Sequence, residues 1–142
     1  MIITNKIPTS QEYIALRLRT GMGLKDENKS EIALKNSRFT VSLWGMNELI
    51  GFGRIVGDNG NVYVVSDVMV DPLYQRQGLG KIIMKELTSY LDNNADQYAY
   101  VILIANKPAD KLYSQFGFDY VEPKACGMRK YIKSDRWDHF YS

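Results

Sequence analysis

The sequence predicts a single α/β (or α+β) domain, in which helices flank both faces of one mixed β-sheet. Runs of strand-forming residues alternate with segments whose apolar residues recur at helical spacing, and this alternation is typical of a layered α/β structure. With 142 residues, of which 45% are hydrophobic, the chain has the size and apolar content of one domain with one core. We therefore treat residues 1–142 as one unit, without linkers or repeats.

The N-terminal part of the chain predicts two helices. Thr9 and Glu12 have the spacing of a capping box, and the apolar positions that follow end near residues 21–23. Asn28 and Glu31 repeat this spacing, which predicts a short second helix from about residue 28 to residue 36.

Three antiparallel strands follow these helices. Residues 39–44, 49–56 and 62–70 are rich in β-branched and aromatic side chains, and they are separated by the turn-forming segments 45–48 and 57–61. Short turns between consecutive strands favour hairpin pairing.

The C-terminal half predicts further helices and strands. A helix with an apolar face at Ile83, Leu87 and Leu91 ends near residues 92–94. The remaining elements are a strand near residues 98–104, a helix near 109–115, and two strands near 118–121 and 127–132.

Composition excludes several classes of function. A net charge of +2 gives no case for broad binding to nucleic acid or to an anionic membrane. One cysteine, Cys126, and one histidine, His139, leave no internal disulfide and too few soft ligands for a typical zinc site, so we expect no metal. Neither a secretion signal nor an apolar run of about 20 residues is present, and we expect a cytoplasmic protein.

A turn with two glycines joins the third strand to the long helix. Gly78 and Gly80 let the backbone approach a ligand, while Arg76 and Lys81 add positive charge beside the first amides of the helix. This arrangement predicts a site for a pyrophosphate, although a purely structural turn is the alternative. The candidate binding residues of this turn are Gln75, Arg76, Gln77, Gly78, Leu79, Gly80 and Lys81.

A second block, residues 101–118, again reads as a strand, a polar break and a short helix that ends at glycine. The two blocks together resemble the GNAT superfamily of acetyl-CoA-dependent N-acetyltransferases over roughly residues 39–132. In that family a Gln/Arg-x-x-Gly-x-Gly/Ala loop holds the pyrophosphate of the coenzyme. The matching residues are Gln75, Gly78, Gly80, Asn106, Ala109, Tyr113, Gly117 and Phe118.

The resemblance implies acetyl-CoA as the acetyl donor and a sheet that splays where the strands ending at residues 70 and 104 separate. Val68, Met69 and Val70 are the expected docking segment for the pantetheine arm, with Ala109 nearby. Asn106 would bind the same arm, or else cap the next helix. The amide of Met69 or Val70 would hold the oxyanion.

The resemblance also implies catalytic roles. Tyr113 matches the general acid of the family, and the alternative is a tyrosine that only packs on the sheet. Asp67 is the candidate general base, because it lies one residue before the docking segment and some sugar-amine acetyltransferases of the family carry an aspartate at this position. The sequence departs from other members, which place a glutamate slightly earlier on the strand, where Val64 and Val65 stand here. The alternative for Asp67 is a structural carboxylate that bonds neighbouring groups.

Acceptor recognition is assigned to Arg54 and Arg17. Arg54 interrupts an apolar strand, so we expect it to have a partner, either the carboxylate of an amino-acid substrate or an ion pair with Asp58 or Asp67. The aromatic tail at residues 135–142 is a candidate to cover a sheet edge or a second subunit in a homodimer.

These observations predict an N-acetyltransferase that transfers acetyl directly to a primary amine, most simply that of an amino acid or an amino sugar. A protein lysine or N-terminal amine is the second acceptor class, and a catalytically idle acyl-CoA sensor is the alternative outside the enzymes. The turn lacks the Gly-Lys-Ser/Thr ending of a nucleotide triphosphatase.

Overall fold

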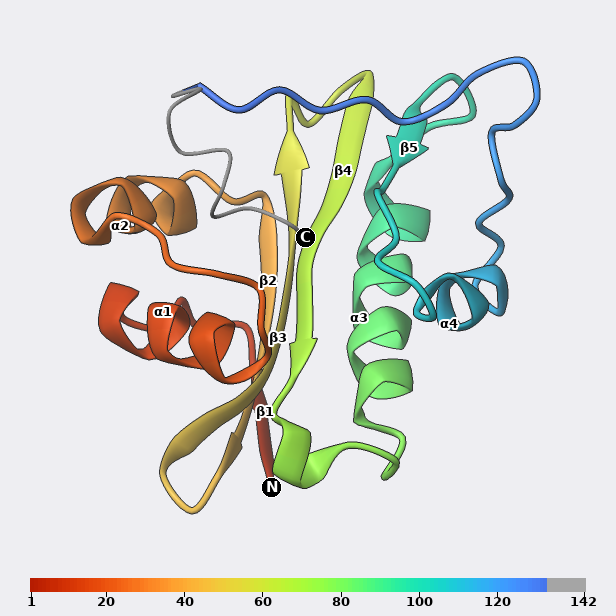
Figure 1. Ribbon diagram of the computed structural model, residues 1–142. Coiled ribbons are helices and arrows are strands. Elements are labelled where there is room, and N and C mark those ends of the chain that lie inside the picture. Colours follow the sequence, from red (N-terminus) through yellow and green to blue (C-terminus); the bar gives the residue numbers. More distant parts are fainter. Residues whose placement is uncertain (133–142) are drawn as a thin grey trace.

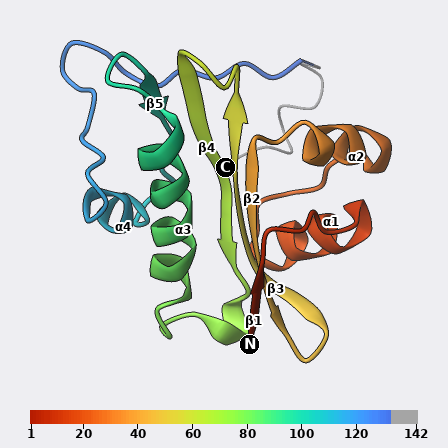
Figure 2. The ribbon, with the colours of Figure 1, turned by 180° about the vertical axis from the view of Figure 1, so that it is seen from behind.

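The protein has three layers, with helices on both faces of one sheet, as the sequence predicts (Figure 1). The structure is a computed structural model, and it describes residues 1–132. Helices α1 (Ser10–Arg19) and α2 (Glu27–Lys35) cover one face of the sheet. Helices α3 (Leu79–Asn94) and α4 (Asp110–Ser114) lie on the opposite side, as the reverse view in Figure 2 also shows.

The sheet has five strands in the described part of the chain, in the spatial order β1-β2-β3-β4-β5. The first four pair antiparallel, and β5 pairs parallel with β4, so the sheet is mixed. The strands are β1 (Ile2–Thr4), β2 (Phe39–Gly45), β3 (Glu48–Gly57), β4 (Val62–Val70) and β5 (Tyr100–Ile102). Strand β1 was not predicted, since three residues carry too little pattern to identify a strand.

The sheet splays between β4 and β5. Their ladder consists of three pairs, from Val62↔Tyr100 to Val64↔Ile102, and β4 then continues to Val70 without β5 beside it. The splay predicted from the family resemblance is therefore present, and it separates the second half of β4 from the C-terminal part of the chain (Figure 1).

A β-bulge interrupts β4 at the start of this free stretch. The register with β3 shifts by one residue between the pairs Phe52↔Met69 and Arg54↔Ser66, and Asp67 has a left-handed backbone with φ of 57°. Aspartate tolerates this conformation better than most residues. The bulge turns the Asp67 side chain toward α1, where it becomes part of an ion-pair cluster.

Two apolar clusters hold the layers together. One lies between the sheet and α3 and includes Ile83, Leu87 and Tyr63, and the other lies under α1 and includes Leu16 and Phe52. Helix α3 packs closely over β3, because a Cβ on Gly53 would lie 2.7 Å from Cγ2 of Ile83. Helix α3 is thus fixed against β2, β3 and β4.

The N-terminus of α1 is capped as predicted, and the N-terminus of α2 differs from the prediction. The Thr9 and Glu12 side chains form the predicted capping box of α1. Helix α2 begins earlier than predicted, because the carboxylate of Asp26 accepts from the Lys29 amide and takes the N-cap position, in place of Asn28.

The predicted C-terminal strands are the main error. Residues 118–121 and 127–132 contain no strand, and β5 is shorter than the predicted 98–104. Their apolar residues gave the pattern of strands, but no partner strand lies beside them in the described chain. The prediction for the tail at residues 135–142 lies outside the described residues. Within residues 1–132, none of the helices combines the length and apolar character that crossing a membrane demands.

Candidate active site

The turn before α3 presents free backbone amides to solvent. A 3₁₀ turn at Pro72–Tyr74 ends β4, and Gln75–Gln77 then lead to Gly78, which is the N-cap of α3. Gly78 has φ of 79° and supplies no side-chain cap. The first backbone bond of the helix at this end joins the Ile82 amide to the Gly78 carbonyl. The amides of Leu79, Gly80 and Lys81 therefore have no partner among residues 1–132, and free amides at a helix N-terminus are groups that can bind an anion.

The two glycines of this turn have different roles. Gly78 adopts a left-handed conformation, which glycine adopts without strain. A Cβ placed on Gly78 would have no atom within 4 Å, so the space beside this residue is open. A Cβ on Gly80 would lie 3.1 Å from Cδ2 of Leu112, so Gly80 lets α4 pack against α3. Gly80 thus has a packing role that the sequence did not reveal. That both glycines let a ligand approach stays a prediction.

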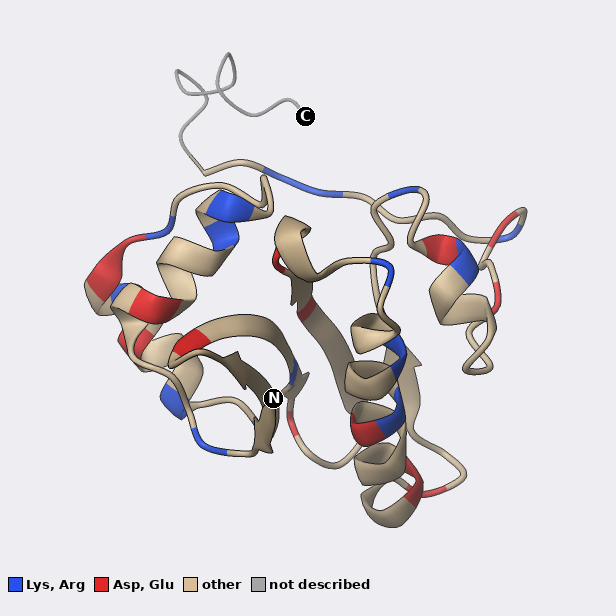
Figure 3. Cartoon of the chain, turned by 90° about the horizontal axis from the view of Figure 1, so that it is seen from below, with Lys and Arg blue, Asp and Glu red and all other residues tan. Residues whose placement is uncertain are grey.

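The turn is tied to the end of β4. Nε2 of Gln75 donates to the carbonyl of Val70 at 3.0 Å, which leaves the Oε1 atom of Gln75 for another partner. Arg76 has φ of 67° and is exposed, while Lys81 lies in the first turn of α3. In the view of Figure 3, both basic and acidic residues occur on the helices. The positive charge at the turn is therefore not part of a larger basic surface in this view.

Val68, Met69 and Val70 lie in the stretch of β4 that extends past the ladder with β5. Val68 and Val70 pack with the α3 cluster, whereas Met69 is buried in the α1 cluster. The backbone edge of this stretch on the β5 side therefore faces the splay, and its side chains are anchored on both faces. An extended chain that enters the splay can bond this edge as an added strand would.

Tyr113 lies on α4 with its ring in the core. The side chain is 9% exposed, and its ring packs edge-on against Phe118 at 6.3 Å between centroids. No hydrogen bond of the hydroxyl to residues 1–132 is present. Burial raises the pKa of Tyr113 above its ordinary value of 10.0, so the hydroxyl holds its proton at neutral pH.

Asn106 and Ala109 lie between β5 and α4. The Ala109 amide bonds the Asn106 carbonyl at 2.9 Å, and Ala109 is the N-cap of α4 without a side-chain cap. The Asn106 side chain therefore does not cap α4. Its Nδ2 atom lies 3.9 Å from Sδ of Met22, which belongs to the loop between α1 and α2. This contact brings that loop across to the far side of the splay.

Asp67, Arg17 and Arg54 meet in one buried cluster under α1 and α2. Arg17 Nη1 contacts Oδ1 of Asp67 at 2.7 Å, and Arg54 Nε contacts Oδ2 at 2.7 Å. The Tyr13 hydroxyl also donates to Oδ2 at 2.7 Å. Burial, followed by the negative charge of Asp67, raises the pKa of Tyr13 to about 12. Both oxygens of Asp67 are therefore already occupied by protein donors.

The two arginines also bond backbone carbonyls of the α1–α2 loop and of α2. Arg17 donates to the carbonyls of Met22 and Gly23, and Arg54 donates to the carbonyl of Ala33. Side-chain exposures of 8% for Arg17 and 14% for Arg54 leave little surface for a ligand. The ion pair between Arg54 and Asp67, one of the two alternatives for Arg54, is the contact found here.

A second ion pair, in which the carboxylate is buried and the arginine is partly exposed, was not foreseen. Nε of Arg19 contacts Oδ2 of Asp71 at 2.8 Å, and Nη2 of Arg19 bonds the Leu49 carbonyl. Asp71 ends β4 and is 3% exposed. The Asp-Pro pair that starts the 3₁₀ turn marks this position as a turn in the sequence, but nothing local identifies Arg19 as its partner.

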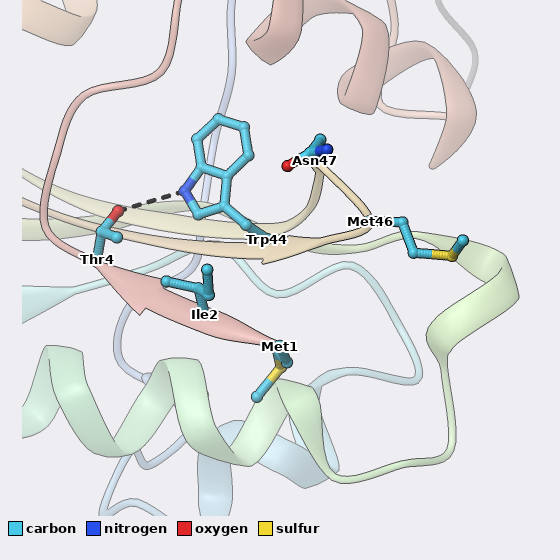
Figure 4. A pocket seen from close by; sticks show the side chains of 6 residues that line it. All are labelled: Met1, Ile2, Thr4, Trp44, Met46 and Asn47. Atoms are coloured by element: carbon cyan, nitrogen blue, oxygen red, sulfur yellow. Dashed lines mark hydrogen bonds between the residues drawn. The ribbon is translucent and has the colours of Figure 1, made fainter.

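A hollow lies elsewhere, at the opposite edge of the sheet (Figure 4). It is formed around β1 and the β2–β3 turn, and Nε1 of Trp44 donates to Oγ1 of Thr4 at 3.3 Å there. Its lining has no charged side chain, and the strand order places β1 three strands from β4. The hollow therefore offers no chemistry for the site at the splay. It is lined by Met1, Ile2, Thr4, Trp44, Met46 and Asn47.

Comparisons with known proteins agree with this geometry. The model of the acetyltransferase (GNAT) domain family matches residues 20–129. A solved structure of a probable acetyltransferase of unknown function from meticillin-resistant Staphylococcus aureus is 44% identical, with a TM-score of 0.87, and the match covers 93% of this chain and 98% of that one.

Curated sequences give the same grouping. The uncharacterized N-acetyltransferase ycf52 of Porphyra purpurea is 34% identical over 94 residues, covering 63% of this chain and 53% of the relative. Histone acetyltransferase TAP1 of Glycine max is 30% identical over 116 residues, covering 74% of this chain and 49% of the relative. The chain spans about half the length of these curated relatives.

Proposed function

The chain belongs to the GNAT acetyltransferase family, and from this premise we propose that it transfers acetyl from acetyl-CoA directly to the primary amine of a small molecule. The observation that carries the proposal is the splay, which brings free amides of α3 and an unpaired edge of β4 to one side of the sheet. A donor with a pyrophosphate and an extended amide-bearing arm fits both features.

The coenzyme half of the site uses the turn and β4. The amides of Leu79, Gly80 and Lys81 would hold the pyrophosphate, with Arg76 and Lys81 supplying charge and Gln77 lining the turn. The β4 edge at Val68–Val70 would hold the pantetheine arm, with Asn106 and Ala109 on the other side. Bound acetyl-CoA supplies an activated thioester, and the protein contributes position and electrostatics.

We assign the chemical roles to few groups. The amide of Met69 or Val70 stabilises the oxyanion that forms when the amine attacks the thioester carbonyl. The Tyr113 hydroxyl, which is protonated and has no hydrogen bond to residues 1–132, gives its proton to the leaving thiolate. Asp67 acts as a positioning residue and not as the base, because Tyr13 and two arginines already occupy its oxygens. Water takes the proton of the acceptor ammonium before the attack, so that the neutral amine is the nucleophile.

The geometry around Arg17 favours a compact acceptor. Arg17 holds the carbonyls of Met22 and Gly23, and Met22 contacts Asn106, so the α1–α2 loop closes one side of the splay. A small amine needs less open surface than an extended peptide. Arg17 and Arg54 both form ion pairs with Asp67, so we no longer propose that they bind a carboxylate of the substrate. An amino sugar is therefore as good a candidate acceptor as an amino acid.

A protein amine is the second candidate. The Glycine max relative at 30% identity is called a histone acetyltransferase, which places a protein acceptor among the similar sequences. A lysine peptide would have to displace the contact between Met22 and Asn106.

Turnover on an acceptor panel tests the function. We expect release of free thiol from acetyl-CoA with at least one amino acid, amino sugar or polyamine, and weaker release with lysine peptides. Preference for a peptide would transfer the proposal to protein acceptors. Calorimetric binding of acetyl-CoA without turnover on any acceptor would favour the sensor alternative, and absence of binding would remove the coenzyme assignment.

Substitution at Gly78 tests the pyrophosphate site. Gly78→Asp and Gly78→Asn are nearly isosteric, and both residues tolerate the left-handed backbone that Gly78 adopts. Because only aspartate adds negative charge at the N-terminus of α3, we expect it to bind acetyl-CoA about tenfold more weakly than asparagine. Calorimetry measures the ratio. Equal affinities of the two variants would show that no anion is held at this turn.

A further inference from the structure

Two ion pairs bracket the stretch of β4 that faces the splay. Arg17 forms its ion pair with Asp67 at the start of this stretch. Arg19 forms its ion pair with Asp71, which directly follows the end of the strand. The two arginines lie two residues apart on α1, and side chains at this spacing on a helix point in different directions. Helix α1 therefore holds both ends of the segment Val68–Val70.

The Arg19 side chain joins the start of β3 to the end of β4. Its Nε atom lies 2.8 Å from Oδ2 of Asp71, and its Nη2 atom donates to the carbonyl of Leu49 at 2.7 Å. Asp71 is 3% exposed, and its other carboxylate oxygen accepts from the Leu73 amide. The Asp71 amide donates to the carbonyl of Ile50 on β3 at 2.7 Å. One side chain of α1 thus completes the set of bonds that fixes this aspartate.

The amide of Val70 faces the splay. Successive residues of a strand direct their backbone groups to opposite sides, and the Asp71 amide points to β3. Val70 therefore directs its amide and carbonyl to the β5 side, where β4 has no neighbouring strand at this level within residues 1–132. The carbonyl agrees with this direction, because it accepts from Nε2 of Gln75 in the turn before α3. Of the amides of Met69 and Val70, that of Val70 is the one directed into the opening.

We propose that Arg19 is a positioning residue for acetyl transfer, which fixes the orientation of the Val70 amide through Asp71. This inference rests on the proposed function, because it assigns the Val70 amide to the oxyanion. A donor stabilises the developing charge only when it is aimed at the position of the oxyanion, and small misplacements lower the rate. Val70 directly precedes Asp71, so a rotation of the Asp71 backbone changes the direction of this amide. Arg19 acts through Asp71 and is assigned no contact with the substrate.

Steady-state kinetics of the variant Arg19→Met test the proposal. Methionine keeps an unbranched apolar stem and removes both donors, and the Arg19 side chain is 36% exposed, so water can replace it and circular dichroism should show a folded protein. We expect kcat to fall about tenfold, with the calorimetric affinity for acetyl-CoA within about threefold of the wild type. Arg19→Lys keeps a cation for Asp71 and should recover most of the loss. The matched control Arg38→Met removes an exposed arginine that bonds the carbonyl of Gly57 at the other end of β3, and it should leave kcat unchanged.

Magnetic resonance of the Val70 amide gives a second readout, which needs no turnover. Acetyl-CoA should move the amide proton signal downfield in the wild type, because the bound donor brings an acceptor to it, and the shift should be smaller in Arg19→Met.

Four results would overturn the inference. They are an unchanged kcat in Arg19→Met, a lysine variant as slow as the methionine variant, an equal loss of kcat in Arg38→Met, and a Val70 signal whose response to acetyl-CoA is absent or equal in wild type and Arg19→Met. If the wild type binds acetyl-CoA but turns over no acceptor, the proposed function fails, and the two shifts still decide whether Arg19 positions the amide.

Discussion

Replacing Asp67 with asparagine is expected to lower the free energy of unfolding by about 3–5 kcal/mol, because the change leaves two buried guanidinium groups without an anion. Asparagine keeps the size of the side chain and tolerates the φ of 57°, so the loss reports the charge and not the backbone. Denaturant unfolding, followed by circular dichroism, measures it. The α1–α2 loop held by Arg17 and the end of α2 held by Arg54 should become more susceptible to proteolysis in the same variant.

The control for this experiment is Asp58→Asn. Asp58 lies in the exposed β3–β4 turn, where one carboxylate oxygen accepts the amides of Gly60, Asn61 and Val62, and asparagine retains that acceptor. Its stability should stay close to that of the wild type. If Asp67→Asn instead unfolds like the wild type but has lost turnover at saturating acceptor, Asp67 is the general base after all, and the positioning role is wrong.

Replacing Tyr113 with phenylalanine is expected to lower kcat by about 100-fold or more, with nearly unchanged affinity for acetyl-CoA. The ring stays in the core beside Phe118, and the hydroxyl has no hydrogen bond to lose within residues 1–132, so stability should not change. Steady-state kinetics with the acceptor found in the panel separates kcat from KM. A kcat equal to that of the wild type would remove Tyr113 from the mechanism.

The pH profile gives an independent readout of the same residue. The acid must be protonated, and burial raises the pKa of Tyr113 above 10.0, so the wild type should keep its activity on the alkaline side up to at least about pH 10. A decline that starts well below this value would come from another group. Tyr90→Phe is the matched control, since its hydroxyl bonds Asn59 at the other end of α3 and should have no effect on turnover.

The fold was predictable where its signals are local. Capping residues and periodic apolar positions identified α1 and α3, and turn residues identified the hairpins of β2, β3 and β4. The strands expected at 118–121 and 127–132 failed for a physical reason: β propensity describes a segment that suits a sheet, but pairing requires an edge at the right place. Strand β1 shows the converse, because Ile2–Thr4 is a strand through its pairing with β2 and not through its own sequence.

The turn before α3 was predictable from the sequence, and the contacts around Asp67 were not. Gly78 and its neighbours form one continuous segment, so spacing alone reveals the turn. The environment of Asp67 depends on a bulge in β4 and on Arg17, which lies 50 residues earlier on another element. An arginine in an apolar strand indicated that Arg54 needs a partner, but the sequence could not choose between Asp58, Asp67 and a ligand.

The three-pair ladder between β4 and β5 has a consequence for engineering the enzyme. Few backbone bonds join these two strands, so their spacing also depends on the apolar cluster that includes Ile83 and Leu87 of α3, against which Val68 of β4 and Val101 of β5 pack. We therefore expect the width of the opening to respond to the volume of these buried side chains. A library confined to these positions would be the place to seek variants that accept acyl chains longer than acetyl.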